Sequence, residues 1–169
     1  RKLRVNYRTT EETKQLAVSV LGNVPVDDLD SGQDSSKGYI SLMHGETPEI
    51  IVTSSFSEEA DAIVERIEQL EAAGAKLQDI CIVARTKKYR DAIGTELTKS
   101  GIQVYEVMAN GVDRRHHEGV RLATMHRVKG LEFQNVFIVG CSQSNVPLQN
   151  FKSQDPVELR EHDMAERAL

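Results

Sequence analysis

The chain of 169 residues is poor in several residue types that mark protein classes: it has no tryptophan, two cysteines and four prolines, and aromatic residues make up 5% of it. Cys81 and Cys141 lie far apart with no second pair, which excludes a disulfide framework and a cysteine-based zinc site. Cys81 lies within an apolar run, where a cysteine usually acts as a small buried hydrophobe. We therefore expect a reducing, cytoplasmic setting.

Long apolar runs and excess positive charge are missing too. No apolar run approaches the roughly 20 residues that a membrane span needs, and Arg1-Lys2 is not followed by the apolar core of a signal peptide. The 21 Lys and Arg against 26 Asp and Glu give a net charge of −5. Because a self-standing nucleic-acid-binding domain usually has a basic surface, any contact with DNA or RNA should be local. No membrane association is expected.

The order of apolar runs and turn signals predicts an α/β fold. The length fits one domain, which would bury about two-thirds of its unfolded surface. Expected strands cover residues 50–52, 79–84, 102–107, 120–123 and 136–139, and expected helices begin near Thr9, Ser55 or Ser57, Thr86 and Asp155. Residues 23–48 are acidic and rich in serine and glycine, which is typical of an irregular surface loop. This alternation predicts three layers around a mostly parallel sheet with right-handed crossovers.

Both ends of the chain have helix signals. Thr9 and Glu12 have the spacing of a capping box, and four apolar residues then share one helical face: Leu16, Ala17, Val20 and Leu21. Asp155 and Pro156 are a typical helix start, but no stop signal follows before Leu169. Because the chain also lacks an initiator methionine, we expect a piece of a longer protein.

The stretch Val120–Gly140 organises the chain. Two apolar runs with strand composition enclose a polar segment, as expected for buried strands of a parallel sheet. This segment contains Thr124, His126, Arg127, Lys129, Gly130 and Glu132. Ligands of parallel sheets bind at the carboxyl ends of the strands, where the polar segment begins. A solvated loop with a chance mixture of charges is the alternative.

No complete active site is visible. The chain contains neither the GxxxxGK[ST] phosphate loop nor the GxSxG elbow of serine hydrolases. His116 and His117 are adjacent, so their side chains would diverge, and without nearby Cys or carboxylate ligands we expect no metal site. The pair Glu58-Glu59 suits the first turn of a helix, and Asp27-Asp28 suits a solvated loop, better than catalysis.

Four stretches resemble motifs of UvrD/Rep-like superfamily 1 DNA helicases. NYRTTEE at 6–12 is similar to motif IV, TMHRVKGLEF at 124–133 to motif V, and EHDMAERAL at 161–169 to the approach to motif VI. VARTKKYRDAIGTELTKSGI at 83–102 resembles the strand–Arg–helix segment of the family. The similarity runs from Leu3 to Leu169, and Thr-x-His-x-x-Lys-Gly-Leu-Glu-Phe is its most specific part.

The resemblance implies a RecA-like fold of the P-loop NTPase type, with residues 1–169 forming one second motor lobe. In such helicases ATP binds between two lobes, and the N-terminal lobe supplies the phosphate loop and the ligands of Mg²⁺. Carried over by position, Arg8 would reach the γ-phosphate as a catalytic arginine finger. Glu132 would accept from the ribose hydroxyls, and Gly130 would keep the backbone close to the nucleotide.

The same resemblance implies a track for single-stranded DNA, with RNA as the alternative. Thr124 and His126 would contact the phosphate backbone, Lys129 would link track and nucleotide, and Arg85 would be a further nucleic-acid contact. Backbone contacts carry no sequence information, which suits a motor that steps along any sequence.

Three departures from the family pattern limit which functions of the family this chain is expected to share. Arg127-Val128 stand where members more often have small residues, which adds a cation beside the track. About a dozen residues separate Val107 from Val120, where many members insert a large accessory domain, so a compact variant is expected, with translocation better supported than unwinding. The chain ends before the motif VI arginine.

We therefore expect the C-terminal motor lobe of an ATP-dependent DNA helicase, inactive as an isolated chain because it lacks the phosphate loop and that arginine. The rival interpretation is a non-catalytic helicase-like α/β module that binds proteins or nucleotides, which the negative net charge favours. A nucleotide-binding regulator is a third, and it would require tight ATP binding by this chain alone.

Overall fold

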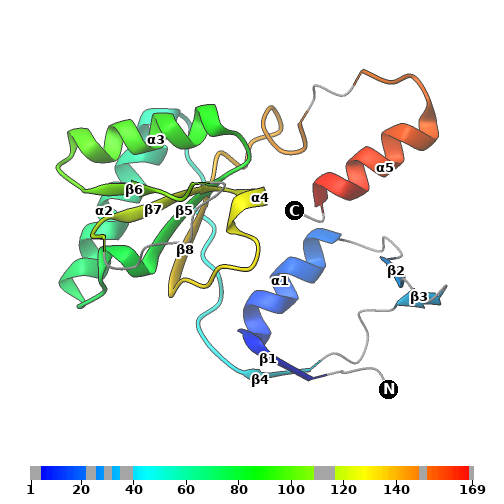
Figure 1. Cartoon of the computed structure of the whole chain (residues 1–169), viewed down its shortest axis with the longest axis horizontal. Coiled ribbons are helices and arrows are strands. Elements are labelled where there is room, and N and C mark those ends of the chain that lie inside the picture. Colours follow the sequence, from blue (N-terminus) through cyan, green and yellow to red (C-terminus); the bar gives the residue numbers. More distant parts are fainter. Residues whose placement is uncertain are drawn as a thin grey trace. The chain divides into compact units, whose positions relative to one another are not determined.

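The computed structural model describes residues 5–21, 26–28, 32–34, 40–108, 117–148 and 152–167. The chain forms two compact units (Figure 1). Unit 1 comprises Arg1–Ile51 with Lys152–Ala168, and unit 2 comprises Val52–Phe151 with Leu169. No helix within the described ranges has the length and apolar character that crossing a bilayer needs.

Unit 2 is built on a four-stranded parallel sheet, which confirms the predicted α/β class. Its strands are β5 (Ile80–Ala84), β6 (Val104–Glu106), β7 (Val120–Thr124) and β8 (Asn135–Val139), in the order β6-β7-β5-β8. All neighbouring strands are parallel. Their carboxyl ends therefore share one edge, here called the carboxyl edge, and their amino ends share the opposite amino edge.

Two helices cover one face of this sheet. They are α2 (Phe56–Ala72) and α3 (Lys87–Lys99). Ser55, one of the two predicted caps, caps α2 by accepting from Glu58 N. The helix predicted to follow Arg85-Thr86 is α3, and Thr86 caps it by accepting from Tyr89 N. The helices bury Ala60, Ile63, Ile67, Ile93 and Leu97 against Ile80, Ile82, Ala84, Val120, Leu122 and Val139. Because both helices return from the carboxyl edge to the amino edge, their first turns lie at the carboxyl edge.

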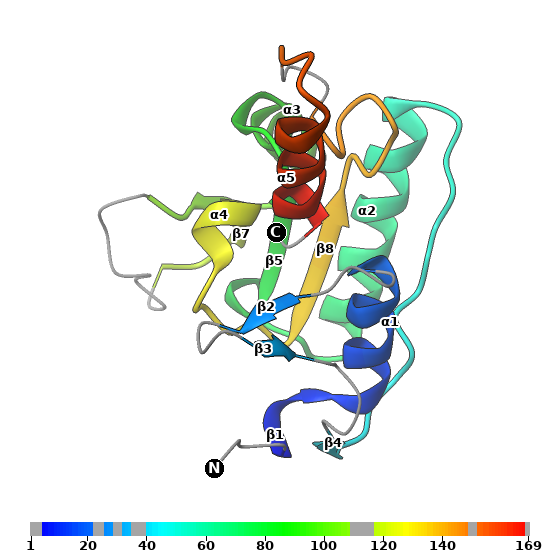
Figure 2. The ribbon, with the colours of Figure 1, turned by 90° about the vertical axis from the view of Figure 1, so that its right-hand side faces the viewer.

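The opposite face has a smaller core beneath α4 (Met125–Val128). Cys81, Val83, Val107 and Ala123 are buried there, and Met125, Val128, Leu131 and Phe133 pack on them. The sheet is thus the middle of the predicted three layers. Figure 2 shows β8 beside β5. We expected β8 to be buried, but Val136 and Ile138 are 51% and 62% exposed. Successive side chains of a strand point to opposite faces, so Phe137 and Val139 pack in the core beneath α2 and α3, while Val136 and Ile138 lie on the other face and belong to neither core.

A carboxylate fixes the point where β8 ends. Glu59, on the first turn of α2, accepts a hydrogen bond from Gly140 N at 2.8 Å and another from the Tyr89 hydroxyl. Burial, and then the bond to Glu59, raise the pKa of Tyr89. The Tyr89 ring also meets Phe56 edge-on, with centroids 5.6 Å apart. We call Glu59, Tyr89 and Gly140 the Glu59 clamp; it joins α2, α3 and the end of β8.

Unit 1 contains the remaining strands and two helices. β1 (Val5–Thr10) pairs in parallel with β4 (Ile40–Met43), and β2 (Val26–Asp28) pairs antiparallel with β3 (Gly32–Asp34). The helices are α1 (Glu11–Leu21) and α5 (Pro156–Arg167). Asp155 Oδ1 accepts from Val157 N at 2.8 Å, as the Asp-Pro start of α5 predicted.

Three local expectations in and beside unit 1 were wrong. Residues 50–52 form no strand, and β4 pairs with β1 instead, within the stretch expected to be an irregular loop. Thr10, rather than Thr9, caps α1 by accepting from Thr13 N at 3.3 Å, since β1 continues to Thr10. The expectation that Leu16 and Val20 share one face of a helix is not among these errors, since both lie on α1 four positions apart; they are 36% and 55% exposed. The prediction of one lobe over residues 1–169 stays a prediction.

Replacing Gly140 by alanine should destabilise the chain more than replacing Gly74. Both glycines have positive φ, 69° and 95°, which costs an alanine about 1–2 kcal/mol. A Cβ on Gly74 meets nothing within 4 Å, whereas one on Gly140 would lie 2.8 Å from Tyr89 Cε1. Because Glu59 holds that ring, Gly140→Ala should cost roughly 2–5 kcal/mol in all. Urea unfolding followed by circular dichroism measures both, and equal losses would contradict the close packing at the clamp.

Candidate nucleotide and nucleic-acid interface

The polar segment of Val120–Gly140 forms an amphipathic turn at the carboxyl edge. β7 ends at Thr124, and the single helical turn α4 follows directly. Leu131 N donates to Val128 O at 2.9 Å, and Gly130 has a φ of 88°, which favours glycine. The apolar side chains of this turn pack on the sheet, while His126, Lys129, Gly130 and Glu132 are exposed. The predicted placement of a polar cluster at the end of the strand is confirmed.

Arg127 binds the protein itself. Its Nε donates to the carbonyl of Met108 at 2.7 Å, and the side chain is half-buried. Met108 follows the end of β6, so this bond joins α4 to the neighbouring strand exit. Arg127, which stands where family members more often have a small residue, therefore fixes this turn through its hydrogen bond and also places a positive charge there.

Arg85 lies beside this turn. Ala84, the last residue of β5, is in register with Thr124 of β7 on one side and with Val139 of β8 on the other. Arg85 and Thr86 thus leave the sheet between α4 and the Glu59 clamp. Arg85 is half-buried, and the next two residues, Lys87 and Lys88, are exposed. The structure therefore brings four predicted nucleic-acid contacts to one edge: Thr124, His126, Lys129 and Arg85.

Arg8 lies in unit 1, on β1, and its side chain is exposed. Unit 2 holds Gly130 and Glu132. The predicted nucleotide site that joins Arg8 to these two residues therefore stays a prediction.

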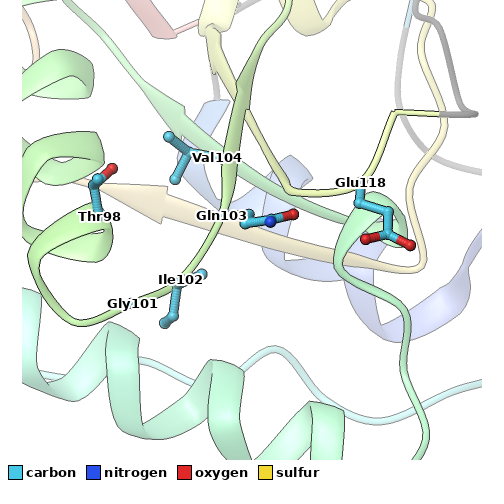
Figure 3. Close-up of a pocket in the computed structure, with 6 residues that line it drawn as sticks. All are labelled: Thr98, Gly101, Ile102, Gln103, Val104 and Glu118. Carbon is cyan, nitrogen blue, oxygen red and sulfur yellow. The ribbon is translucent and has the colours of Figure 1, made fainter.

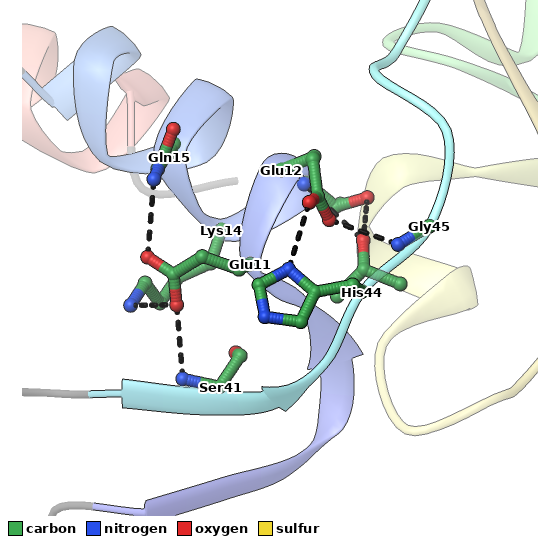
Figure 4. Close-up of polar contacts among 9 residues, drawn as sticks. Glu11, Glu12, Lys14, Gln15, Ser41, His44 and Gly45 are labelled. Atoms are coloured by element: carbon green, nitrogen blue, oxygen red, sulfur yellow. Dashed lines mark hydrogen bonds and ion pairs between the residues drawn. The ribbon is translucent and has the colours of Figure 1, made fainter.

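Two glutamates of α1 hold the strands around Arg8 in place (Figure 4). Glu11 accepts from Ser41 N at 2.9 Å, from Lys14 at 2.6 Å and from Gln15 at 3.2 Å. Glu12 contacts His44 Nδ1 at 2.9 Å and accepts from Gly45 N at 3.0 Å. Glu12 was expected to complete a capping box, but it binds the segment after β4 instead.

The same contacts stabilise the charged forms of both carboxyls. The bond from Lys14, followed by that from Ser41 N, lowers the pKa of Glu11 to about 2. The bond from His44, followed by that from Gly45 N, lowers the pKa of Glu12. Both carboxylates link α1 to β4 and its following residues, and so fix the short sheet that contains Arg8.

The remaining candidate sites lie elsewhere. Among the described residues, no three His, Cys, Asp or Glu side chains are grouped to hold a metal ion, and His116 lies outside those residues. A pocket at the amino edge is lined by Thr98, Gly101, Ile102, Gln103, Val104 and Glu118 (Figure 3). It is at the end of the sheet opposite the polar turn.

The two glutamate contacts predict a loss of stability in acid. Both folded-state pKa values lie below the ordinary 4.5, so their stabilising effect is present above pH 4.5 and is lost as the pH falls through the folded values, towards 2 for Glu11. The difference in free energy of unfolding between the natural chain and Glu11→Gln/Glu12→Gln should therefore shrink over this range. Urea unfolding at several pH values tests this, and a difference independent of pH would contradict the assigned contacts.

Comparison with known proteins places this chain in one protein family. The profile of the UvrD-like helicase C-terminal domain matches residues 1–116 and 107–167. The chain is 34% identical over 107 residues to the ATP-dependent DNA helicase HMI1, mitochondrial, of Saccharomyces cerevisiae. That match covers 60% of this chain and 15% of the relative, so the chain spans a small part of the yeast protein.

A solved structure has the same fold. The C-terminal domain of a possible DNA helicase from Lactobacillus plantarum WCFS1 matches with a TM-score of 0.61. The match covers 95% of this chain and 81% of that domain, at 19% sequence identity. At this identity the similarity supports the fold, and the compact RecA-like architecture predicted from the sequence is confirmed.

Proposed function

The chain belongs to the family of UvrD-like helicase C-terminal domains, and we propose that it is the second motor lobe of an ATP-dependent DNA helicase or translocase of superfamily 1. One observation supports this most strongly: the exposed or half-buried Thr124, His126, Lys129 and Arg85 share the carboxyl edge of unit 2. Hydroxyl, imidazole and cationic groups are suitable partners for phosphate oxygens.

In this proposal the polar turn binds two ligands. Its first residues, Thr124 and His126, contact the backbone of single-stranded DNA, and Lys129 connects that contact to the nucleotide. Gly130 lets the backbone approach ATP, and the exposed carboxylate of Glu132 accepts from the ribose hydroxyls. Because only three residues separate His126 from Gly130, a movement of this short turn when one ligand binds also changes the contact with the other ligand.

Arg8 completes the nucleotide site by stabilising charge on the γ-phosphate. An arginine finger contributes about 10³–10⁵ to the rate in phosphoryl transfer. ATP and Mg²⁺ are held mainly by the N-terminal lobe of the same protein, and closure of two lobes on ATP drives movement along the strand. This chain alone should therefore hydrolyse no ATP. RNA is the alternative to DNA as the bound strand. The cytoplasmic location stays a prediction, and the yeast relative is named as mitochondrial.

A non-catalytic helicase-like module that binds a protein is the second candidate, supported by the net charge of −5. A fold of this kind can lose its motor function and keep a docking role. The two candidates differ in what Lys129 and Arg8 do, which the following two experiments measure.

Lys129→Ala should weaken binding of the chain to single-stranded oligo(dT) and make it less sensitive to salt. One lost phosphate contact reduces the slope of log K against log[salt] by about 0.7. Lys76→Ala removes the same charge before β5, at the amino edge, and is the matched control. Fluorescence anisotropy titrations at several salt concentrations measure both. Equal slopes for Lys129→Ala and Lys76→Ala would argue against a track at the carboxyl edge.

Arg8→Ala, made in the full-length protein, should reduce DNA-stimulated ATP hydrolysis by about 10³-fold or more. The reason is that the γ-phosphate loses a cation needed chiefly in the transition state, so the effect should fall on the turnover rate. Lys76→Ala again serves as the control and should leave turnover unchanged. Undiminished hydrolysis by the Arg8→Ala protein would favour the non-catalytic module.

A further inference from the structure

The turn that follows β8 lies at the same edge as the proposed track. Because Ala84 is in register with both Thr124 and Val139, the exits of β7, β5 and β8 stand in a row. Neighbouring strands are about 4.8 Å apart, so this row spans about 10 Å. The first two exits carry Thr124, His126 and Arg85, and the third leads into residues 140–148.

The composition of this third exit suits a phosphate backbone. Residues 140–148 read GCSQSNVPL and contain no acidic side chain that would repel a phosphate. Ser142, Gln143 and Ser144 are exposed. Hydroxyl and amide side chains and backbone N–H groups are common partners of phosphate and sugar oxygens. The turn therefore offers neutral donors beside the cations of α4 and Arg85.

Hydrogen bonds within the turn fix these donors in place. Ser142 O accepts from Asn145 N and Val146 N, each at 2.9 Å. The Ser142 and Ser144 hydroxyls lie 2.9 Å apart, and Asn145 Nδ2 donates to Ser142 Oγ at 3.1 Å. Each of the two serine hydroxyls carries one hydrogen, and the hydrogen bond between them uses one of these two hydrogens. The other hydrogen can donate to an acceptor outside the turn.

The Glu59 clamp holds the base of this turn. Glu59 accepts from Gly140 N, where the turn begins, and from the hydroxyl of Tyr89 on the first turn of α3. Arg85 and Thr86 directly precede α3, and Thr86 caps it. We call residues 140–148 the serine turn. The carboxylate of Glu59 thus fixes this serine turn relative to the end of β5, which carries Arg85.

We propose that Ser142 and Ser144 bind the phosphate backbone of single-stranded nucleic acid as a third part of the track, and that Glu59 and Tyr89 are positioning residues for it. The inference rests on the proposed function, since it extends the same edge by one strand exit. A strand bound to this protein then crosses α4, Arg85 and the serine turn in that order or its reverse.

The test is equilibrium binding of the 169-residue chain to fluorescently labelled single-stranded oligo(dT) at several salt concentrations. Ser142→Ala/Ser144→Ala should weaken binding about fivefold at every salt concentration, as expected for one lost neutral hydrogen bond. The salt slope should stay unchanged because no cation is lost. Ser100→Ala, at the exposed C-cap of α3 and the amino edge, is the matched control and should bind like the natural chain.

The clamp is tested by Tyr89→Phe, which removes the bond to Glu59 and keeps the ring against Gly140. This variant should keep the circular dichroism spectrum and also weaken binding. Its effect should largely disappear in the Ser142→Ala/Ser144→Ala background, because both changes act through one contact. Fully additive effects would show that Tyr89 does not position the serine turn, which would overturn that part of the proposal.

The remaining outcomes separate the two levels of the proposal. Unchanged binding of Ser142→Ala/Ser144→Ala, with weakened binding of Lys129→Ala, overturns the serine contact and leaves the motor-lobe proposal standing. Unchanged binding of both variants overturns both. If an excess of ATP removes the difference between Ser142→Ala/Ser144→Ala and the natural chain, the turn binds nucleotide phosphate and the proposed contact with the strand is wrong.

Discussion

Parallel pairing of β5 with β7 and β8 is the constraint on which the site depends. A parallel ladder forces the three strands to end at one edge, and every polar residue that follows a strand then lies at that edge. The pairing also requires connections that return the chain from one edge to the other: α3 follows β5, and α4 with its turn lies between β7 and β8. The first turn of α3 brings Tyr89 to the carboxyl edge, and α2, which precedes β5, brings Glu59 to the same edge, where it binds Gly140 N. The register in which β5 pairs with β7 and β8 therefore determines where the residues of the proposed track lie.

Carboxylates stabilise both units by binding distant backbone amides. Glu11 and Glu12 accept from Ser41 N and Gly45 N, 30 and 33 residues away, and Glu59 accepts from Gly140 N, 81 residues away. A first-turn glutamate usually gains from the helix dipole. Here each also binds a distant backbone N–H: that of Ser41 lies within β4, and those of Gly45 and Gly140 follow the ends of β4 and β8. The strands are thus fixed by side chains that carry none of the proposed chemistry.

Local patterns predicted the elements whose cause is local. β5, β7, α2 and α3 follow from apolar runs, caps and helical spacing, and the polar turn follows from the break between β7 and β8. Features decided by distant partners were missed: β4 rather than residues 50–52 pairs with β1, β8 has an exposed face, and Glu59 serves as a clamp instead of an ordinary first-turn acid. Thr124, His126 and Lys129 were predicted from the resemblance to motif V, and Arg85 from the resemblance to the strand–Arg–helix segment. The serine turn has no such motif, and only the strand register places it at the same edge.

The central claim is that the carboxyl edge of unit 2 binds single-stranded nucleic acid. Hydrogen–deuterium exchange of the chain with and without oligo(dT) tests it most directly, because it maps protection along the backbone without any substitution. The account predicts slower exchange at Arg85–Tyr89 and Thr124–Gly130, with little change at the amino edge. Protection concentrated at Thr98–Val104, on the opposite edge, would contradict it.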